Sequence, residues 1–269
     1  EECRGGTMSI QIPKQLHQIW VGPKPIPDQQ KEWIQGWKEK HPEWDHRLWR
    51  DEAVRAHLPE EALAFFEAAE SYAGQADVAR VWIVHKFGGV YVDTDFQCLR
   101  PIGELLHGCK AFAVVEGYDG KLMNGLFGAV PDHPLMKTLI EQWGRRFDPG
   151  DPTKTGPLLF DDVVRGEKRS DVRIFEREIF APVTGGDRHR LETEEEEDWA
   201  DSYAVHHYEQ SWQDEVEWED ILESRKSKEY ALYKARSHAR HLKNKALERV
   251  RTSSLYPYYA WAKNKLGGD

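Results

Sequence analysis

Two carboxylates stand one residue apart at the end of an apolar stretch, in the segment FGGVYVDTDFQCL (87–99). Asp93 and Asp95 follow residues 90–92, whose β-branched and aromatic side chains are typical of a buried strand. Burying a carboxylate costs free energy unless a cation or hydrogen-bond donors meet it. The pair therefore indicates either a turn that requires acids or a site for Mg²⁺ or Mn²⁺, ions that prefer hard oxygen ligands.

An acid and a base stand three residues apart upstream, and they share one face of a predicted helix over 73–87. This helix carries too much apolar surface to be solvated all round, so Asp77 and Arg80 need partners. They could pair with each other. However, Gly88 and Gly89 lead directly into the strand that ends in the two aspartates, and α/β sheets bind ligands at the carboxyl ends of strands. The combination is a stronger signal for a site than Asp-x-Asp alone.

The elements that must position these residues alternate between strands and helices, which predicts an α/β layer fold. Lys86 in the last turn and Gly88 just beyond it predict the end of the helix. Besides 73–87 and the strand before Asp93, the expected helices are 29–40, 51–57, 59–70 and 133–147, and the expected strands are 15–20, 46–49, 111–116, 122–130, 173–175 and 203–206.

The composition is that of a globular protein. The 269 residues are 39% hydrophobic and include 11 tryptophans, enough for a core without disulfides. No run of about 18 apolar residues predicts a membrane span. Three cysteines without metal-ligand spacing predict reduced, packed thiols and a cytoplasmic location.

The segment DVARVWIVHKFGGVYVDTD (77–95) resembles the signature of glycosyltransferase family 32, a sugar-binding region with a DXD motif, and more distantly the glucosylating clostridial toxins. The family pattern is Asp-x-x-Arg, a helix, and Gly-Gly-[Ile/Val]-Tyr-[hydrophobic]-Asp-x-Asp, and every fixed position is met. Further segments resemble the family in matching order, namely IPKQLHQIWVG (12–22), NGLFGAVPDHPLMKTLIE (124–141) and VHHYEQSW (205–212).

The resemblance implies a GT-A fold, which is a Rossmann-like mixed sheet flanked by helices. It also implies a nucleotide-sugar donor bound with a divalent ion, usually Mn²⁺ and otherwise Mg²⁺. Trp20 would stack on the nucleotide base, and Asp77 and Arg80 would hold donor-sugar hydroxyls. Asp93 would contact the ribose or the sugar, and Asp95 the metal.

The closing segment would supply a further metal ligand or a pyrophosphate contact. His207, Glu209 and Ser211 are the candidates, with Trp212 over the leaving group. We expect His207 to bind the metal. His206, a strand neighbour that faces the other way, is the competing choice.

Two other polar positions have structural as well as functional interpretations. Asn124 opens a strand before Gly125, so it is either an ordinary turn residue or an amide that points at sugar hydroxyls. Asp161 and Asp162 in TGPLLFDDVV (155–164) are expected to be acids at a helix N-terminus rather than catalytic groups.

The sequence thus predicts a metal-dependent glycosyltransferase that retains anomeric configuration. A UDP-sugar is favoured as donor over a GDP-sugar, and a saccharide, a lipid-linked molecule or another hydroxyl compound is the acceptor. One alternative is a haloacid-dehalogenase-like phosphotransferase with Asp93 as nucleophile. The other is a non-catalytic module that binds nucleotide sugars or carbohydrate.

The charge is unevenly distributed and divides the chain into a catalytic domain over 8–213 and a basic helical appendage over 214–269. Residues 1–224 hold 25 basic and 44 acidic side chains, whereas 225–269 hold 12 basic and 3 acidic ones. The acidic body makes nucleic acid a poor partner. The tail either packs across the domain or lies on an anionic membrane surface through 224–269, which would put the protein at the inner face of a membrane.

Sedimentation with anionic liposomes tests the membrane hypothesis for the tail. If basic residues in 224–269 contact lipid headgroups, removing this segment abolishes co-sedimentation, because about 1 kcal/mol per basic residue near the surface is lost. Equal sedimentation with and without the segment would contradict membrane binding.

Overall fold

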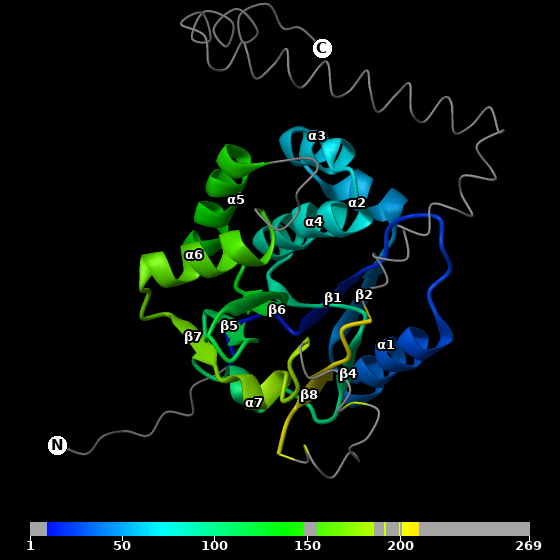
Figure 1. Cartoon of the computed structure of the whole chain (residues 1–269), viewed down its shortest axis with the longest axis vertical. Helices are drawn as coiled ribbons and strands as arrows, with labels where there is room; N and C mark the ends of the chain where they lie inside the picture. The colour runs from blue at the N-terminus through cyan, green and yellow to red at the C-terminus, as the bar shows by residue number, and fades with distance from the viewer. Residues whose placement is uncertain (1–9, 148–154, 186–190, 192–198, 200, 210–269) are drawn as a thin grey trace, which may run out of the picture. The chain divides into compact units, whose positions relative to one another are not determined.

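The computed structural model describes residues 10–147, 155–185, 191, 199 and 201–209. Within them a mixed sheet of six strands forms the centre of the fold, in the order β2-β1-β3-β6-β5-β7 (Figure 1). β6 runs antiparallel to β3 and β5, and the other neighbours in the sheet are parallel. The strands are β1 (Gln15–Ile19), β2 (Asp45–Trp49), β3 (Gly89–Val92), β5 (Ala111–Val115), β6 (Leu122–Ala129) and β7 (Val172–Phe175).

A second, two-stranded antiparallel sheet joins β4 (Phe96–Cys98) to β8 (Ala204–His206). Its register pairs Phe96 with His206, so a strand near residue 205 lies directly beside the end of the Asp-x-Asp segment. A contact between residues more than 100 positions apart is therefore built into the backbone of this small sheet.

Helices cover both faces of the central sheet (Figure 1). The helices α2 to α6 share one apolar core with the sheet, while α1, α7 and the small sheet belong to a second core on the other face. Their bounds are α1 (Asp28–Lys40), α2 (Asp51–His57), α3 (Glu60–Ala68), α4 (Tyr72–Phe87), α5 (Pro134–Arg146), α6 (Pro157–Glu167) and α7 (Arg177–Phe180), with a 3-10 turn at Gly103–Leu106.

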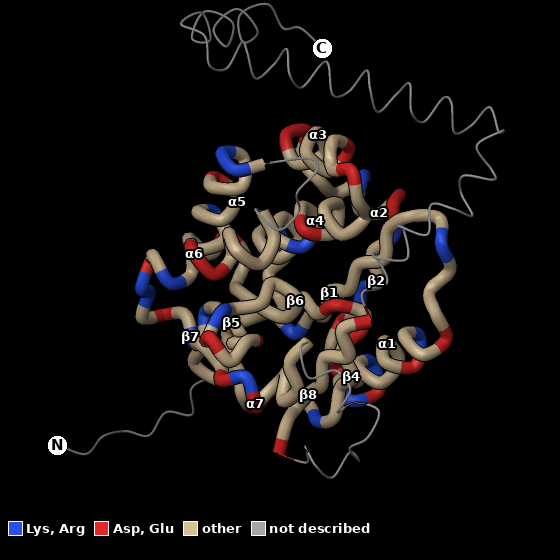
Figure 2. The backbone as a smooth tube through the Cα atoms, viewed as in Figure 1, with Lys and Arg blue, Asp and Glu red and all other residues tan. Residues whose placement is uncertain are grey.

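The side chains of the strands alternate between the two cores, as a pleated sheet requires. Tyr91 and Phe127 pack into the first core, whereas Val90, Val92 and Leu126 pack into the second. β5 and β6 carry no charged residue, while the outer helices such as α3 and α6 carry several (Figure 2). The mixed sheet flanked by helices that the sequence predicts is confirmed.

α4 carries the acid–base pair into the core and stops sharply. Ser71 caps its N-terminus by accepting a hydrogen bond from the backbone of Gly74 (3.1 Å). Gly88 ends the helix with φ +65°, and Gly89 follows with φ +92°. A Cβ atom on Gly89 would lie 2.7 Å from the carbonyl oxygen of Gln15, so glycine is required where α4 passes into β3.

The expected helices and strands agree with the structure to within a few residues, with some omissions. The expected helices did not include α6. The sequence also did not predict β4, α7 or the 3-10 turn, because three or four residues are too few for a periodic pattern. The appendage and the domain boundary at 213 lie outside the described residues and stay predictions. No helix in the described ranges is long and apolar enough to cross a membrane.

A buried histidine fixes the Gly-Gly turn to the first strand. His17 accepts a hydrogen bond at Nδ1 from Trp49 Nε1 (3.2 Å), so its proton is on Nε2, which donates to the carbonyl oxygen of Gly88 (2.9 Å). Burial lowers the pKa of His17 to about 4, outweighing the hydrogen bond to Gly88. The fold therefore requires the neutral imidazole at this position.

The pH dependence of stability tests this requirement. In the unfolded chain His17 takes up a proton near pH 6.5, whereas in the folded chain it does so only near pH 4. The free energy of unfolding should therefore fall as the pH drops from 6.5 towards 4, by on the order of 3 kcal/mol from this residue. Urea titrations of wild type and His17→Gln over this range should give a shallower pH slope for the variant. Equal slopes would contradict the neutral, buried state of His17.

Candidate active site

The polar groups of the candidate site gather at one edge of the central sheet. Asp93 and Asp95 follow the carboxyl end of β3, Trp20 follows that of β1, and Glu116 follows that of β5. β6 runs the opposite way, so Asn124 near its beginning lies at the same edge. This is the edge at which α/β sheets bind ligands.

Arg80 lies at the centre of a buried network that links α4 to β3 and β6. Its Nη2 atom is 3.4 Å from Asp77 Oδ1 and 3.3 Å from Asp93 Oδ1, and its Nη1 atom donates to the backbone oxygen of Asn124 (3.0 Å). The Asn124 side chain donates to Asp77 Oδ1 (2.7 Å). Arg80 therefore contacts Asp77, Asp93 and Asn124, and Asn124 contacts Asp77 as well.

Tyr91 on β3 also belongs to this network. Its hydroxyl group donates a hydrogen bond to the Asp93 carboxylate, and the Arg80 guanidinium lies 4.7 Å from the centre of its ring. Burial alone would lower the pKa of Arg80, but Asp93, Tyr91 and Asp77 raise it above its ordinary value. The guanidinium thus stays charged inside the protein.

The two carboxylates that face Arg80 differ from ordinary surface acids. Burial raises the pKa of Asp77 to about 6, although Arg80 and the Asn124 amide oppose the shift. Burial also raises the pKa of Asp93, against the attraction of Arg80 and with the repulsion of Asp95 added. Removing Arg80 would leave both acids without their cation.

Asp93, Asp95 and His206 form a group that can hold a metal ion, since one ligand atom from each lies within 4.8 Å of the others. His206 Nε2 is 3.4 Å from Asp95 Oδ1. Burial alone would raise the pKa of Asp95, but the His206 ring and the backbone N–H of Glu209 lower it below its ordinary value. Two carboxylates and one imidazole are a donor set that suits Mn²⁺ or Mg²⁺, so these residues fit the divalent ion that the sequence predicts.

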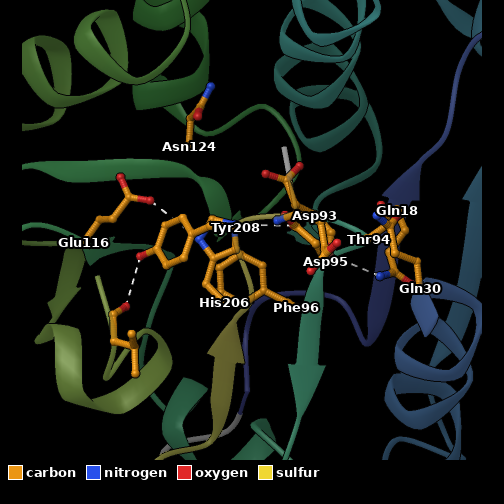
Figure 3. A network of polar contacts seen from close by, with 12 residues as sticks. Gln18, Gln30, Asp93, Thr94, Asp95, Phe96, Glu116, Asn124, His206 and Tyr208 are labelled. Carbon is orange, nitrogen blue, oxygen red and sulfur yellow. Dashed lines mark hydrogen bonds and ion pairs between the residues drawn. The ribbon is translucent and has the colours of Figure 1, made fainter. Parts of the chain in front are cut away.

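The His206 ring is fixed on both faces (Figure 3). Phe96 stacks on it with ring centres 4.2 Å apart, and Tyr208 contacts it at 3.8 Å. Burial would lower the pKa of His206, but Asp95 and Glu116 raise it to about 10. Without a metal ion the ring is therefore a cation between two carboxylates.

The segment 206–209 wraps around Asp95. The backbone N–H of His207 donates to the Asp95 carbonyl oxygen (3.0 Å), and that of Glu209 donates to Asp95 Oδ2 (3.1 Å). Tyr208 adopts a left-handed backbone with φ +53°, and its hydroxyl donates to the carbonyl oxygen of Val183 (3.1 Å). The backbone and the carboxylate of Asp95 thus join the loop after β3 to the chain after β8.

His207, the expected metal ligand, is not part of the metal-binding group in the described residues. Its ring stacks on Trp33 with centres 4.1 Å apart, and its Nε2 atom lies 3.0 Å from Gln97 Oε1. Consecutive residues of a strand face opposite sides, and the pairing of β8 with β4 turns His206 towards Asp95. The geometry favours His206, the competing choice, and which of the two histidines binds a metal stays a prediction.

The other expected site residues have varied positions. Trp20 is half-buried at the end of β1, and its Nε1 donates to the carbonyl oxygen of Lys24 (2.9 Å). Ser211 and Trp212 lie outside the described residues, and their roles stay predictions. Asp161 and Asp162 lie beyond the first turn of α6, so the expectation of acids at a helix N-terminus is wrong. Asp161 instead accepts hydrogen bonds from the backbone of Leu122 and from Arg165, which is a structural role.

Several residues of the site were not found from the sequence. Tyr91 is a fixed position of the Gly-Gly-Val-Tyr pattern, so its type was noticed but its contact with Asp93 was not. Glu116 had one signal, a carboxylate directly after a buried strand, as at Asp93. Thr94 separates the two aspartates and also donates to Gln30 Oε1 (2.9 Å), which ties α1 to the site.

Replacement of Arg80 tests whether its charge supports the two acids. Arg80→Met should lower the free energy of unfolding by about 3–5 kcal/mol, because it leaves the buried carboxylate of Asp77 and the partly buried one of Asp93 without their cation. Adding Asp77→Asn should restore part of the loss. Urea unfolding of wild type and both variants measures these differences. A loss below about 1 kcal/mol, as for a surface ion pair, would contradict the central role of Arg80.

Known proteins resemble the chain in this region. Residues 27–111 match the family described as "Glycosyltransferase sugar-binding region containing DXD motif". The chain is 31% identical over 143 residues to inositol phosphoceramide mannosyltransferase 3 of Schizosaccharomyces pombe, covering 51% of this chain and 38% of that protein. It is 25% identical to the uncharacterized glycosyltransferase L373 of Acanthamoeba polyphaga mimivirus, covering 64% of this chain and 73% of that protein.

The fold also has a solved counterpart. The PaToxG glycosyltransferase superposes with a TM-score of 0.50 at 19% identity, covering 58% of this chain and 69% of that one. The mixed sheet flanked by helices is therefore a GT-A fold. The matched residues hold Asp77, Arg80, Asp93 and Asp95, so the part of the chain that carries these residues is similar to the glycosyltransferase sugar-binding region with a DXD motif.

Proposed function

We propose that the chain is a metal-dependent glycosyltransferase that moves a sugar from a nucleotide-sugar donor to a hydroxyl acceptor. The observation that carries this proposal is the Asp93–Asp95–His206 group directly beside the Arg80 network, since both aspartates and Arg80 lie in the region that matches the DXD-containing family. The carboxylates would repel one another and would also repel an anionic diphosphate. A divalent ion bound between them would offset this repulsion.

Each residue of the site would have a distinct task. Asp95 and His206 would hold the ion, with Asp93 at its side, and a bound divalent ion would stabilise negative charge on the leaving diphosphate. Asp77, through its hydrogen bond with the Asn124 amide, would fix polar groups that face the sugar hydroxyls. Arg80 would keep both acids ionised at neutral pH.

The arrangement supports displacement with retention of anomeric configuration. Asp77 and Asp93 are the acids nearest to Arg80, and contacts with Arg80, Asn124 and Tyr91 hold them in place, so neither is a free nucleophile. In the proposed step the acceptor oxygen attacks the anomeric carbon from the face that the diphosphate leaves. The acceptor proton passes to the departing phosphate oxygen.

The donor is proposed as a nucleotide sugar and the acceptor as a compound with a free hydroxyl group. The sequence favours a UDP-sugar and keeps a GDP-sugar as the alternative, and the name of the Schizosaccharomyces pombe relative adds mannose to the sugars worth testing. That name also adds inositol phosphoceramide to the acceptors worth testing. Because this chain spans 38% of that relative, donor and acceptor are proposed as classes only.

The two other candidate functions have less support. A phosphotransferase needs Asp93 as a nucleophile, yet Arg80 and Tyr91 both engage its carboxylate. A non-catalytic binding module would keep the donor contacts without turnover. It is the alternative that a direct assay of donor hydrolysis and transfer must distinguish.

Removal of one metal ligand tests the function. With Mn²⁺ the wild type should release the nucleoside diphosphate slowly from a nucleotide sugar even without acceptor, and EDTA should stop the reaction. Asp95→Asn should reduce kcat/KM by on the order of a hundredfold or more, because charge on the leaving group is no longer offset. A coupled assay for the diphosphate, over a panel of UDP- and GDP-sugars, measures both effects.

Asp45→Asn is the matched control, since Asp45 is an exposed aspartate at the opposite end of the parallel strands. It should leave turnover unchanged. Metal-dependent turnover that survives in Asp95→Asn would contradict the mechanism. Donor binding without any turnover in the wild type would favour the binding module.

A further inference from the structure

Glu116 stands at the carboxyl end of β5, where it faces the edge of His206 that points away from Asp95 (Figure 3). Its Oε1 atom is 3.5 Å from His206 Nδ1, while His206 Nε2 lies 3.4 Å from Asp95 Oδ1. The two nitrogens of one imidazole thus address two different carboxylates. Only one of these, Asp95, belongs to the metal-binding group.

Glu116 itself has a defined backbone. Its N–H donates to the carbonyl oxygen of Lys121 (2.8 Å), which closes the loop between β5 and β6. Its side chain is 30% exposed, whereas the ring that it faces is buried. The carboxylate therefore lies between solvent and a buried ring.

The plane of the His206 ring is fixed, whereas the position of its proton depends on its hydrogen-bond partners. Phe96 and Tyr208 hold its plane, but stacking alone does not decide which nitrogen carries the proton. Its Nδ1 atom is buried and makes no hydrogen bond of ordinary geometry within the described ranges. An imidazole binds a metal through a nitrogen that has no proton, so the other nitrogen must donate its proton to an acceptor.

We propose that Glu116 is a positioning residue for the metal site, which accepts the Nδ1 proton of His206 and so presents Nε2 to the ion. This inference rests on the proposed metal-dependent function. Carboxylates behind histidine ligands fix the tautomer and the ring orientation and raise the basicity of the ligand. A shift of Glu116 of a few tenths of an ångström would bring its carboxylate to hydrogen-bond distance of Nδ1.

Mn²⁺ affinity of the full chain, measured by isothermal titration calorimetry, tests the proposal. Glu116→Ala should weaken Mn²⁺ binding by about 10–100-fold, the range for groups behind metal ligands. Glu116→Gln keeps a carbonyl oxygen that can accept the Nδ1 proton, so its affinity should lie between the two. Asp119→Asn, an exposed acid on the same loop, is the control and should bind like the wild type.

Kinetics separate positioning from a general loss of structure. In Glu116→Ala the Mn²⁺ concentration for half-maximal turnover should rise with the dissociation constant, while kcat at saturating Mn²⁺ stays near the wild-type value. If Glu116→Ala does not fold, Glu116→Gln provides the test. Its Mn²⁺ affinity should be about threefold weaker than that of the wild type, because the hydrogen bond that it accepts is no longer made to a charged group.

Mn²⁺ binding by Glu116→Ala within twofold of the wild type would overturn the role of Glu116 while leaving the metal site intact. An equal loss in Asp119→Asn would also overturn it, because the loop and not the carboxylate would then matter. A wild type that does not bind Mn²⁺ would overturn the metal site itself. The two proposals thus fail with different results.

Discussion

The contact of one guanidinium with the buried carboxylate of Asp77 and the partly buried carboxylate of Asp93 is the interaction on which the rest of the site depends. Arg80 reaches Asp77 on its own helix, Asp93 at the end of β3, and the backbone of Asn124 at the start of β6. Taking such acids out of water is costly, and the cation offsets that cost only where all three elements meet. The contacts of Arg80 at the edge of the sheet that could bind a ligand therefore also fix how α4 packs against the sheet.

The two acids of the DXD motif have different partners. Arg80 and Tyr91 hold Asp93, whereas Asp95 faces the His206 ring and the backbone of the segment that follows β8. A divalent ion can replace the charge of a protonated histidine beside Asp95, since both are cations at the same carboxylate. The spacer Thr94 lets the two acids point to these separate surroundings while it anchors α1 through Gln30.

Much of this arrangement could be predicted from short-range patterns. The helix over 73–87, its end at Gly88 and the buried strand before Asp93 follow from periodicity and glycine chemistry, and the structure confirms them. The choice between His206 and His207 could not be made in this way. It depends on the pairing of β8 with β4, two three-residue strands more than 100 residues apart, and a one-residue difference in register reverses which histidine faces Asp95. The contact of Glu116 with His206 could not be predicted for a related reason, since His206 lies on a strand distant in sequence.

Pulsed electron paramagnetic resonance of the Mn²⁺-bound protein tests the central claim most directly, because it detects a histidine nitrogen bound to the ion. His206→Gln and His207→Gln form a matched pair of neighbouring substitutions. Coordination by Asp93, Asp95 and His206 predicts a nitrogen coupling in the wild type that persists in His207→Gln and disappears in His206→Gln. A coupling that disappears only in His207→Gln, or is absent from the wild type, would contradict the claim.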